Sequence, residues 1–456
     1  MKSVLRPAVA AIVLFVAVSA IYLPDVGHGF IRDDVGWVGR NELRSWSDLR
    51  EVGSARAGLF RPAVSLSFAL ERRACGVSPL CYGLTNFLLL IACTGAVVML
   101  ARSFGLTAGA ALVAGAIWVL NWHGISSAVL WISGRTALFL VLFAALAAVF
   151  FVRGRWIGAT LCVAAAMFSK EEAVLLPVAL LAWGLLGAYA EGQPVLTRRH
   201  VGFFLGSAAA GALYLAMRAR SGALTAASAP AYYRLDFSVA RLLSNGPEYL
   251  DRSLTFTVAV VLLLWLVYRP NVAAAVRTNR RLFWFATIWW VCGFAITMFI
   301  PVRSSLYACL PSIGFALAAA AVLHDVWCQL DAPRRMRTVL AGLLLPFALW
   351  PVYHFRNKDL VDATDVSART IAALQEVAAA YGANTVVVIK DDRSRRASVD
   401  TAFGTGLQDV VDIVVTPRVA VWMDPPPADA ELGGIAAAPA HPDVTLRLQD
   451  GRLVKD

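Results

Sequence analysis

The chain has 456 residues, of which 59% are hydrophobic and 16% are charged, and it carries a net charge of +11. Because a soluble domain has about a quarter charged residues, this composition excludes a soluble globular protein and predicts that lipid surrounds most of the chain. The arginines and lysines stand singly between apolar runs, with no basic stripe and no nucleic-acid motif, so nucleic acid is excluded as a partner.

Runs without Asp, Glu, Lys or Arg predict about eleven membrane-spanning helices, since about 20 apolar residues cross a bilayer as a helix. The first run resembles a signal peptide, with Lys2 and Arg6 before the apolar stretch and Val18-Ser19-Ala20 at its end. We expect a retained anchor there, because many more spans follow. The expected spans are residues 7–24, 82–101, 104–121, 134–152, 156–169, 173–190, 201–217, 253–268, 282–301, 305–324 and 338–354.

The polar segment after the first span, residues 25–81, is predicted to contain an amphipathic helix at Ala63–Leu70 that lies along the membrane interface. Pro62 fits the first position of such a helix. Cys75 and Cys81 share this loop and are able to form a disulfide if it faces an oxidising compartment. Four other cysteines lie in apolar runs and are expected to be packing residues: Cys93, Cys162, Cys292 and Cys309.

The short loops predict a cytoplasmic N-terminus, because those that would then lie inside are rich in arginine and almost free of acids. Loop 25–81, which would lie outside, carries eight arginines with seven acidic residues, so its charge is near balance. We therefore expect an integral protein of a bacterial inner (plasma) membrane, with an extracytoplasmic C-terminal domain. The inner arginines are Arg102, Arg153, Arg155, Arg198, Arg199, Arg269, Arg277, Arg280, Arg281, Arg334, Arg335 and Arg337.

The composition changes near residue 355, which divides the chain into a membrane domain, 1–354, and a soluble domain, 355–456. Residues 363–381 predict an amphipathic helix, and Thr385–Lys390 predicts a buried strand. The expected fold is an α-helical polytopic membrane protein with a small C-terminal α/β or α+β domain. Further short strands are predicted at 411–415, 419–422 and 443–448.

Polar residues that an ordinary loop would not need collect at the predicted outer ends of the spans. Asp33 and Asp34 follow the first span closely, and a carboxylate at the edge of the low-dielectric region can act as a general base. The alternative is a pair of solvated acids. Arg61 is expected near headgroup phosphate or as a simple interfacial anchor. His123, in the outer segment 121–134, fits interfacial packing better than a role as base or ligand.

Arg135 ends a 32-residue stretch without formal charge, so it needs an anionic partner, a phosphate or a carboxylate. Lys170 and Glu171 lie between two spans joined by almost no loop, where charges must pair or face a wet cavity unless they form an ordinary tight turn. Arg303 stands between two apolar spans with Tyr307 one turn away. It is interpreted as a ligand of an anion or as a snorkelling side chain.

In order along residues 20–315, these segments resemble the GT-C superfamily of membrane glycosyltransferases, most nearly the transmembrane O-mannosyltransferases that usually carry tetratricopeptide repeats. The sequence departs from that group at Gly83, where the group has His, at Gly124, where it has Pro, and at Ser126-Ser127, where an acid is expected. No 34-residue repeat is present. The matching elements are Asp33-Asp34, Arg61-Pro62, Gly76–Tyr82 leading to Asn86, His123, Val129–Arg135, Ser169-Lys170-Glu171 and Arg303–Tyr307.

The resemblance implies transfer of a sugar, with inversion, from a polyprenyl-phosphate-linked donor to a hydroxyl of an acceptor glycan, lipid or protein. Asp33 would be the base and Asp34 would support it or bind the acceptor. The donor phosphate would be bound by Arg303, Arg135, Lys170, Tyr307 and Arg61, while His123, Glu171 and Asn86 would bind acceptor or support the site. No cofactor or metal is required, although Asp33, Asp34 and Glu171 could hold a divalent ion weakly.

Two other functions fit the same composition. A transporter or flippase for a polyprenyl lipid or glycolipid would use the arginines to bind a passing phosphate, but we find no symmetry between halves of the chain. A non-catalytic subunit of a glycan assembly complex would explain the departures from the family pattern.

Overall fold

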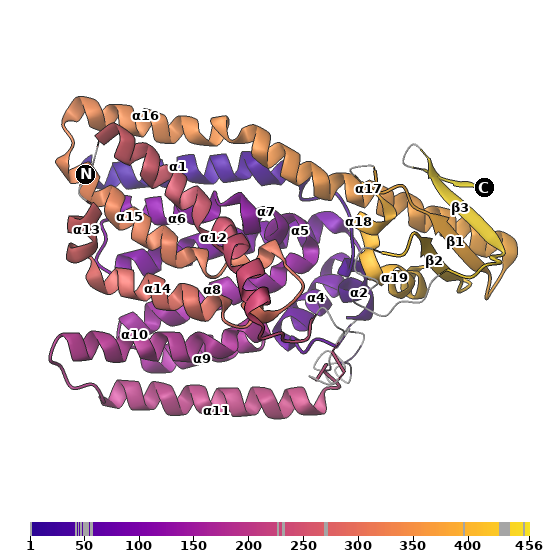
Figure 1. Cartoon of the computed structure of the whole chain (residues 1–456), viewed down its shortest axis with the longest axis horizontal. Coiled ribbons are helices and arrows are strands. Elements are labelled where there is room, and N and C mark those ends of the chain that lie inside the picture. Colours follow the sequence, from indigo (N-terminus) through magenta and orange to yellow (C-terminus); the bar gives the residue numbers. More distant parts are fainter. Residues whose placement is uncertain are drawn as a thin grey trace.

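The computed structural model describes residues 2–41, 43, 45, 48, 54, 58–225, 228–229, 233–268, 272–394, 397–427, 438–449 and 452–456. A bundle of long helices carries a small sheet domain at one end, and the N-terminus lies at the other end of the bundle (Figure 1). The bundle helices are α1 (Lys2–Tyr22), α5 (Pro79–Ser103), α6 (Ala108–Val119), α7 (Trp122–Leu130), α8 (Arg135–Val152), α9 (Trp156–Met167), α10 (Leu176–Ala190), α11 (Arg198–Arg220), α12 (Val239–Tyr268), α13 (Val272–Thr278), α14 (Arg280–Phe294), α15 (Ser312–Gln329) and α16 (Ala332–Ala348).

Length and apolar composition allow seven helices of the described part to cross a membrane, or eight if the bent pair α6 and α7 is one span. Every predicted span falls on a helix of the bundle, although α9, α12 and α14 are not among the seven. The apolar runs form helices because a helix satisfies its own backbone hydrogen bonds, which lipid cannot do. The predicted helical polytopic fold is therefore confirmed.

The bend between α6 and α7 departs from the prediction of a polar outer segment over 121–134. The axis turns by 72° at this break. Asn121 precedes α7, and its side chain accepts a hydrogen bond from the backbone N–H of His123 at 3.3 Å. Asn at such a cap satisfies a free backbone donor and starts a new helix in a new direction. The segment is therefore a short buried helix followed by a turn at Ile132–Gly134.

Two short helices lie at the end of the bundle that faces the sheet domain (Figure 1). The first, α2 (Asp34–Arg40), begins directly after Asp33. The second, α4 (Pro62–Cys75), contains the predicted amphipathic segment and begins at Pro62, as expected. Val64, Phe68 and Ala69 of α4 are buried. A disulfide joins Cys75, at the end of α4, to Cys81 in the first turns of α5.

The long helix α17 (Trp350–Tyr381) connects the bundle to the sheet domain and runs through residue 355 without a break. In its first turns Tyr353 donates to the carbonyl of Leu120 at 2.6 Å, and Asn357 donates to the carbonyl of Ile21 at 2.8 Å. Its later turns bury Leu374 and Ala378 in the core of the sheet domain. One continuous helix thus contributes to both parts of the protein.

The sheet domain confirms a small C-terminal fold of mixed helices and strands. Its four strands are β1 (Val386–Lys390), β2 (Ala420–Asp424), β3 (Val444–Gln449) and β4 (Arg452–Lys455), in the order β2-β1-β3-β4. β1 is parallel to both neighbours, while β3 and β4 are antiparallel. The strands predicted at 385–390, 419–422 and 443–448 are present.

The strand predicted at 411–415 is wrong. Residues Leu407–Val414 form helix α19, which follows the short helix α18 (Val399–Phe403). Leu407, Val410 and Val411 are buried, and their spacing places them on one helical face. A run of β-branched residues favours a strand, but the burial of this face in the core prevails over that propensity.

Candidate active site

Asp33 and Asp34 lie side by side in sequence but in different environments. Asp34 is fully buried. Its Oδ1 accepts hydrogen bonds from the backbone N–H of Ser133, at 2.7 Å, and from the Ser133 hydroxyl, while Oδ2 accepts from the N–H of Ile31 at 3.0 Å. Asp33 is exposed, and its Oδ2 accepts from the indole Nε1 of Trp37 at 3.1 Å. Asp34 is therefore fixed in place, and Asp33 is the member of the pair that a substrate can reach.

Both carboxyl groups have raised pKa values. Although Asp33 reaches solvent, the protein around it removes much of its hydration and raises its pKa, against the lowering effect of Ser133, Trp37 and the Arg61 charge. Burial, together with the neighbouring Asp33 carboxylate, raises the pKa of Asp34 to about 7. A base whose pKa lies closer to neutrality is better suited to accept a proton from a hydroxyl.

A set of paired charges lies beside this aspartate pair at the ends of the bundle helices. The guanidinium of Arg61 forms a two-pronged ion pair with Glu171, at 3.0 and 2.6 Å. Lys170 is buried and pairs with Glu172 at 2.8 Å. The ammonium of Lys170 also lies 4.9 Å from the centre of the Tyr307 ring. The charges predicted to need pairing are therefore paired, and Arg61, Lys170, Glu171 and Tyr307 are brought together.

Arg303 lies in a further charge cluster that the sequence did not reveal. It pairs with Glu248, and the other oxygen of Glu248 pairs with Arg252. Arg303 is exposed, whereas the Arg252 side chain is 15% exposed. Nη1 of Arg252 is buried and lacks a hydrogen-bond partner among the described residues. One carboxylate therefore holds two arginines, with a free N–H donor beside it.

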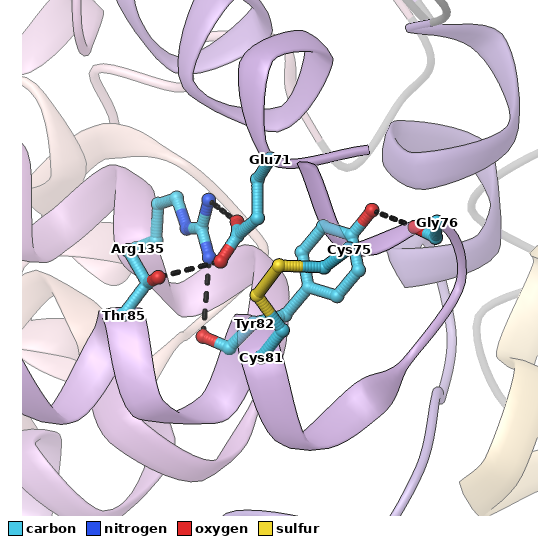
Figure 2. Close-up of a disulfide and its surroundings, with 7 residues drawn as sticks. All are labelled: Glu71, Cys75, Gly76, Cys81, Tyr82, Thr85 and Arg135. Atoms are coloured by element: carbon cyan, nitrogen blue, oxygen red, sulfur yellow. Dashed lines mark hydrogen bonds and ion pairs between the residues drawn. A yellow bond between two sulfur atoms is a disulfide. The ribbon is translucent and has the colours of Figure 1, made fainter. Parts of the chain in front are cut away.

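The predicted phosphate ligand Arg135 is instead part of the protein core. Its side chain is fully buried and donates to Glu71 at 2.5 Å and to the carbonyl of Tyr82 at 3.1 Å (Figure 2). It also donates to Oδ1 of Asn86 at 3.0 Å. The guanidinium also stacks 4.2 Å from the centre of the Phe68 ring. Its anionic partner is thus a carboxylate rather than a ligand phosphate, and the arginine ties α8 to α4 and α5.

Asn86 has the same structural function. Its amide nitrogen donates to the carbonyl oxygens of Val129, Trp131 and Ile132, at 3.1 to 3.3 Å, and these residues end α7 and lead to Ser133. The network also includes Thr85, which donates to Glu71, and Tyr82, whose hydroxyl donates to the carbonyl of Gly76 beside the disulfide (Figure 2). Asn86 therefore supports the turn that holds Asp34 and does not face a substrate.

His123 lies apart from the aspartate pair, on the side where α7 meets α12. Its Nε2 is 3.9 Å from a carboxylate oxygen of Asp251, and its ring lies 5.5 Å from that of Trp122. His123 therefore packs beside Trp122 and an exposed acid, and its location at the membrane interface stays a prediction.

The glycines at two departures from the family pattern have a steric reason. A Cβ at Gly83 would lie 1.8 Å from the carbonyl oxygen of Val26, and one at Gly124 would lie 2.6 Å from the sulfur of Cys309. The carbonyl of Val26 lies too close to Gly83, and the side chain of Cys309 too close to Gly124, for a larger residue at either position. These positions therefore reflect close packing of α5 and α7 against their neighbours, and they are not open sites from which a side chain has been lost.

Among the described residues, no group of three or more His, Cys, Asp or Glu side chains is arranged to hold a metal ion. Asp33, Asp34 and Glu171 do not form such a group, because Glu171 pairs with Arg61 and Asp34 with Ser133.

The raised pKa of Asp34 predicts a stability that depends on pH. Because the folded-state pKa of about 7 lies above the ordinary value of 3.8, the folded chain holds a proton that the unfolded chain releases. The contribution of Asp34 is therefore most favourable at acidic pH and is lost as the pH rises to about 7. Asp34→Asn should remove this loss, so the apparent Tm of the variant minus that of wild type should rise between pH 5 and 7. A difference that falls over this range would contradict the assignment.

The sequence matches no known family model and no curated protein sequence. ArnT from Cupriavidus metallidurans bound to undecaprenyl phosphate has a similar fold, with a TM-score of 0.44 and 16% identity over 84% of this chain and 73% of that one. ArnT from the same organism in the apo state gives a TM-score of 0.48 and 17% identity over 84% and 72%. Likenesses of this size concern the fold alone.

Proposed function

We propose that the chain is an inverting glycosyltransferase of the GT-C type. It moves a sugar from a polyprenyl-phosphate-linked donor to an acceptor hydroxyl at the outer face of the membrane that it spans. The observation that carries the proposal is the aspartate pair, with Asp34 anchored on Ser133 and Asp33 exposed beside Arg61, at an end of an apolar helix bundle. A general base with cations beside it suits transfer from a lipid-linked sugar, because the cations stabilise the charge that develops on the leaving phosphate.

In the proposed reaction, the Asp33 carboxylate accepts the proton of the acceptor hydroxyl while that oxygen bonds to the anomeric carbon of the sugar. The bond from this carbon to the lipid phosphate breaks, and the phosphate leaves with the electron pair, which inverts the carbon. Asp34 holds the backbone of this segment through its hydrogen bonds to Ile31 and Ser133. Removing the proton by a positioned base contributes about 10²–10⁴-fold.

The leaving phosphate needs cations whose N–H groups are not all occupied by hydrogen bonds within the protein. Arg252 has such a donor in its unpartnered Nη1, and Arg303 is exposed beside it. Glu248 holds both arginines and thus occupies the position of an anion between them. Arg61, paired with Glu171, adds positive charge near Asp33, and Lys170, paired with Glu172, lies beside the Tyr307 ring. We assign Arg303 and Arg252 to the donor phosphate, with Lys170, Arg61 and Tyr307 in support, and exclude Arg135.

The acceptor is proposed to be a hydroxyl of a glycan, lipid or protein, and the membrane the inner membrane of a bacterium, with the N-terminus inside and the sheet domain outside. The O-mannosyltransferase subgroup remains a proposal that rests on the sequence motifs.

The test is transfer of a radiolabelled sugar by the purified protein in lipid nanodiscs, supplied with a panel of polyprenyl-phosphate sugars and candidate acceptors. Transfer from one of these donors by the wild type supports the proposal. Movement of the lipid between leaflets of vesicles without any transfer would instead favour a transporter. Donor binding without transfer, in the presence of the acceptor, would favour a non-catalytic subunit.

If Arg303 binds the donor phosphate, Arg303→Ala should weaken donor binding by about 10–150-fold, because a hydrogen bond to a charged group contributes about 1.5–3 kcal/mol. Arg303→Lys keeps the charge but not the planar fork, so partial recovery is expected. Arg281 is the matched control, since it is exposed and paired with Glu191 at the start of α14. Binding of a fluorescent polyprenyl-phosphate analogue measures the effect. Equal losses for Arg303→Ala and Arg281→Ala would show that the effect is general charge, and the assignment would fail.

A further inference from the structure

Helix α2 begins directly after Asp33 and belongs to both parts of the protein. Val35 is buried in the hydrophobic core of the sheet domain, where it packs with residues of α17, α18 and α19. Trp37 and Val38 are buried in a separate cluster with Val64 and Phe68 of α4. The same seven-residue helix thus contributes side chains to two cores, and Figure 1 shows it between the bundle and the sheet domain.

The backbone before α2 is bound directly to the sheet domain. The N–H of Arg32 donates to the carbonyl of Ala402 at 2.7 Å, and its side-chain Nε donates to the carbonyl of Thr401 at 3.4 Å. Arg32 has a φ of 51°, in the left-handed region that an arginine rarely adopts. Such a conformation persists where the surrounding contacts determine it. Here the contacts on either side of Asp33 come from α18 and from the turn at Ser133.

The far end of α2 is also in contact with the sheet domain. Arg40 forms an ion pair with Asp409 at 3.6 Å. A Cβ at Gly39 would lie 2.5 Å from Cγ2 of Ile413 in α19, so the two helices approach as closely as a glycine allows. In contrast, a Cβ at Gly36 would meet no atom within 4 Å. The interface with α19 therefore lies on one face of α2, and Gly39 marks it.

We propose that the sheet domain positions the catalytic base. Its α18–α19 edge holds the backbone of Arg32 and the helix α2, while the bundle holds Asp34 through Ser133. Asp33 is therefore placed by both parts together. This inference rests on the proposed function of Asp33. It assigns to Arg32, Val35 and Gly39 a positioning role and to the sheet domain a part in turnover, beyond any role in binding the acceptor.

The consequence is a specific kinetic effect. A change at the α2–α19 contact should move Asp33 relative to the bound sugar without touching the cations that bind the donor. A displacement of about 1 Å far from the chemistry can cost up to about 100-fold in rate. We therefore expect kcat per folded molecule to fall while the KM for the donor stays nearly constant, so the folded fraction is measured for each variant.

The test compares Gly39→Ala with Gly36→Ala, two identical substitutions on the same helix. Gly39→Ala should lower kcat about 10- to 100-fold and raise amide hydrogen exchange in residues 31–40, because its methyl group meets Ile413. Gly36→Ala should behave as wild type in both measurements. Adding Ile413→Ala to Gly39→Ala removes the atom in the way, and we expect kcat and exchange to recover together. Asp409→Arg, which repels Arg40, gives a second variant should Gly39→Ala not fold.

The two measurements separate the two proposals. A wild type without sugar transfer would overturn the proposed function, whereas the exchange of residues 31–40 would still show whether the sheet domain holds this segment. If Gly39→Ala is folded and its kcat equals that of Gly36→Ala, the positioning role is overturned, whatever the exchange shows. Raised exchange with a lower kcat that Ile413→Ala restores would establish it.

Discussion

Asp33→Asn is expected to lower turnover by at least about 100-fold while leaving donor binding almost unchanged. The substitution keeps the size of the side chain and an oxygen that can accept the hydrogen bond from Trp37, but it removes the site that accepts a proton. Because the donor is assigned to cations elsewhere, only the chemical step should suffer. Turnover is measured by sugar transfer and binding by the fluorescent donor analogue.

The matched control is Asp48→Asn, a half-buried aspartate in the same polar segment that is hydrogen-bonded to Ser45. It should retain wild-type turnover. If Asp33→Asn retained full activity, Asp33 would not be the base and the assignment would move to Asp34. Catalysis by Asp34 would require a conformational change, because Asp34 is fully buried and both of its oxygens accept hydrogen bonds from the protein. A substrate would reach it only after that segment had moved.

The sequence predicts the helical bundle well because lipid imposes a simple requirement. A long run without charge must be a helix in the membrane, so the positions of the apolar runs determine the positions of the helices. The prediction fails where local capping and tertiary burial decide. Asn121 starts a new helix within the segment predicted to be an outer loop. Likewise, α19 contains a run that favours a strand, but its buried face requires a helix.

The sequence predicts which residues belong to the candidate site, but not which of its charged side chains pair with one another. The expectation that Arg135 needs an anionic partner is correct, yet the partner is Glu71, 64 positions earlier in the chain. Arg303 and Glu248 are 55 positions apart, and no local pattern indicates that they meet. Charge and burial can be estimated from a sequence, whereas the choice of partner depends on how the helices pack. For the same reason, the contact of α2 with the sheet domain could not be predicted.

Arg135→Met should be the most destabilising single substitution among the residues discussed, with an expected loss of about 3–5 kcal/mol in the free energy of unfolding. The reason is the partner: Glu71 is only 8% exposed, and the substitution leaves its carboxylate buried without the arginine. Asn86 and the carbonyl of Tyr82 also lose a donor. Denaturant unfolding in detergent micelles measures the loss. Arg153→Met is the control, because Arg153 donates to Ser103 at an exposed position.

The double variant Arg135→Met with Glu71→Met separates the value of the ion pair from the cost of breaking it. Replacing both charges with apolar side chains of similar length leaves no unpaired carboxylate, and such replacements of buried ion pairs are often neutral or stabilising. We therefore expect the double variant to recover most of the stability lost by Arg135→Met. Sugar transfer by this variant then tests the structural role of Arg135 directly. If the variant is stable and active, the arginine serves to hold α4, α5 and α8 together. If it is stable but no longer binds the donor, Arg135 does take part in binding the phosphate, as the sequence alone had indicated.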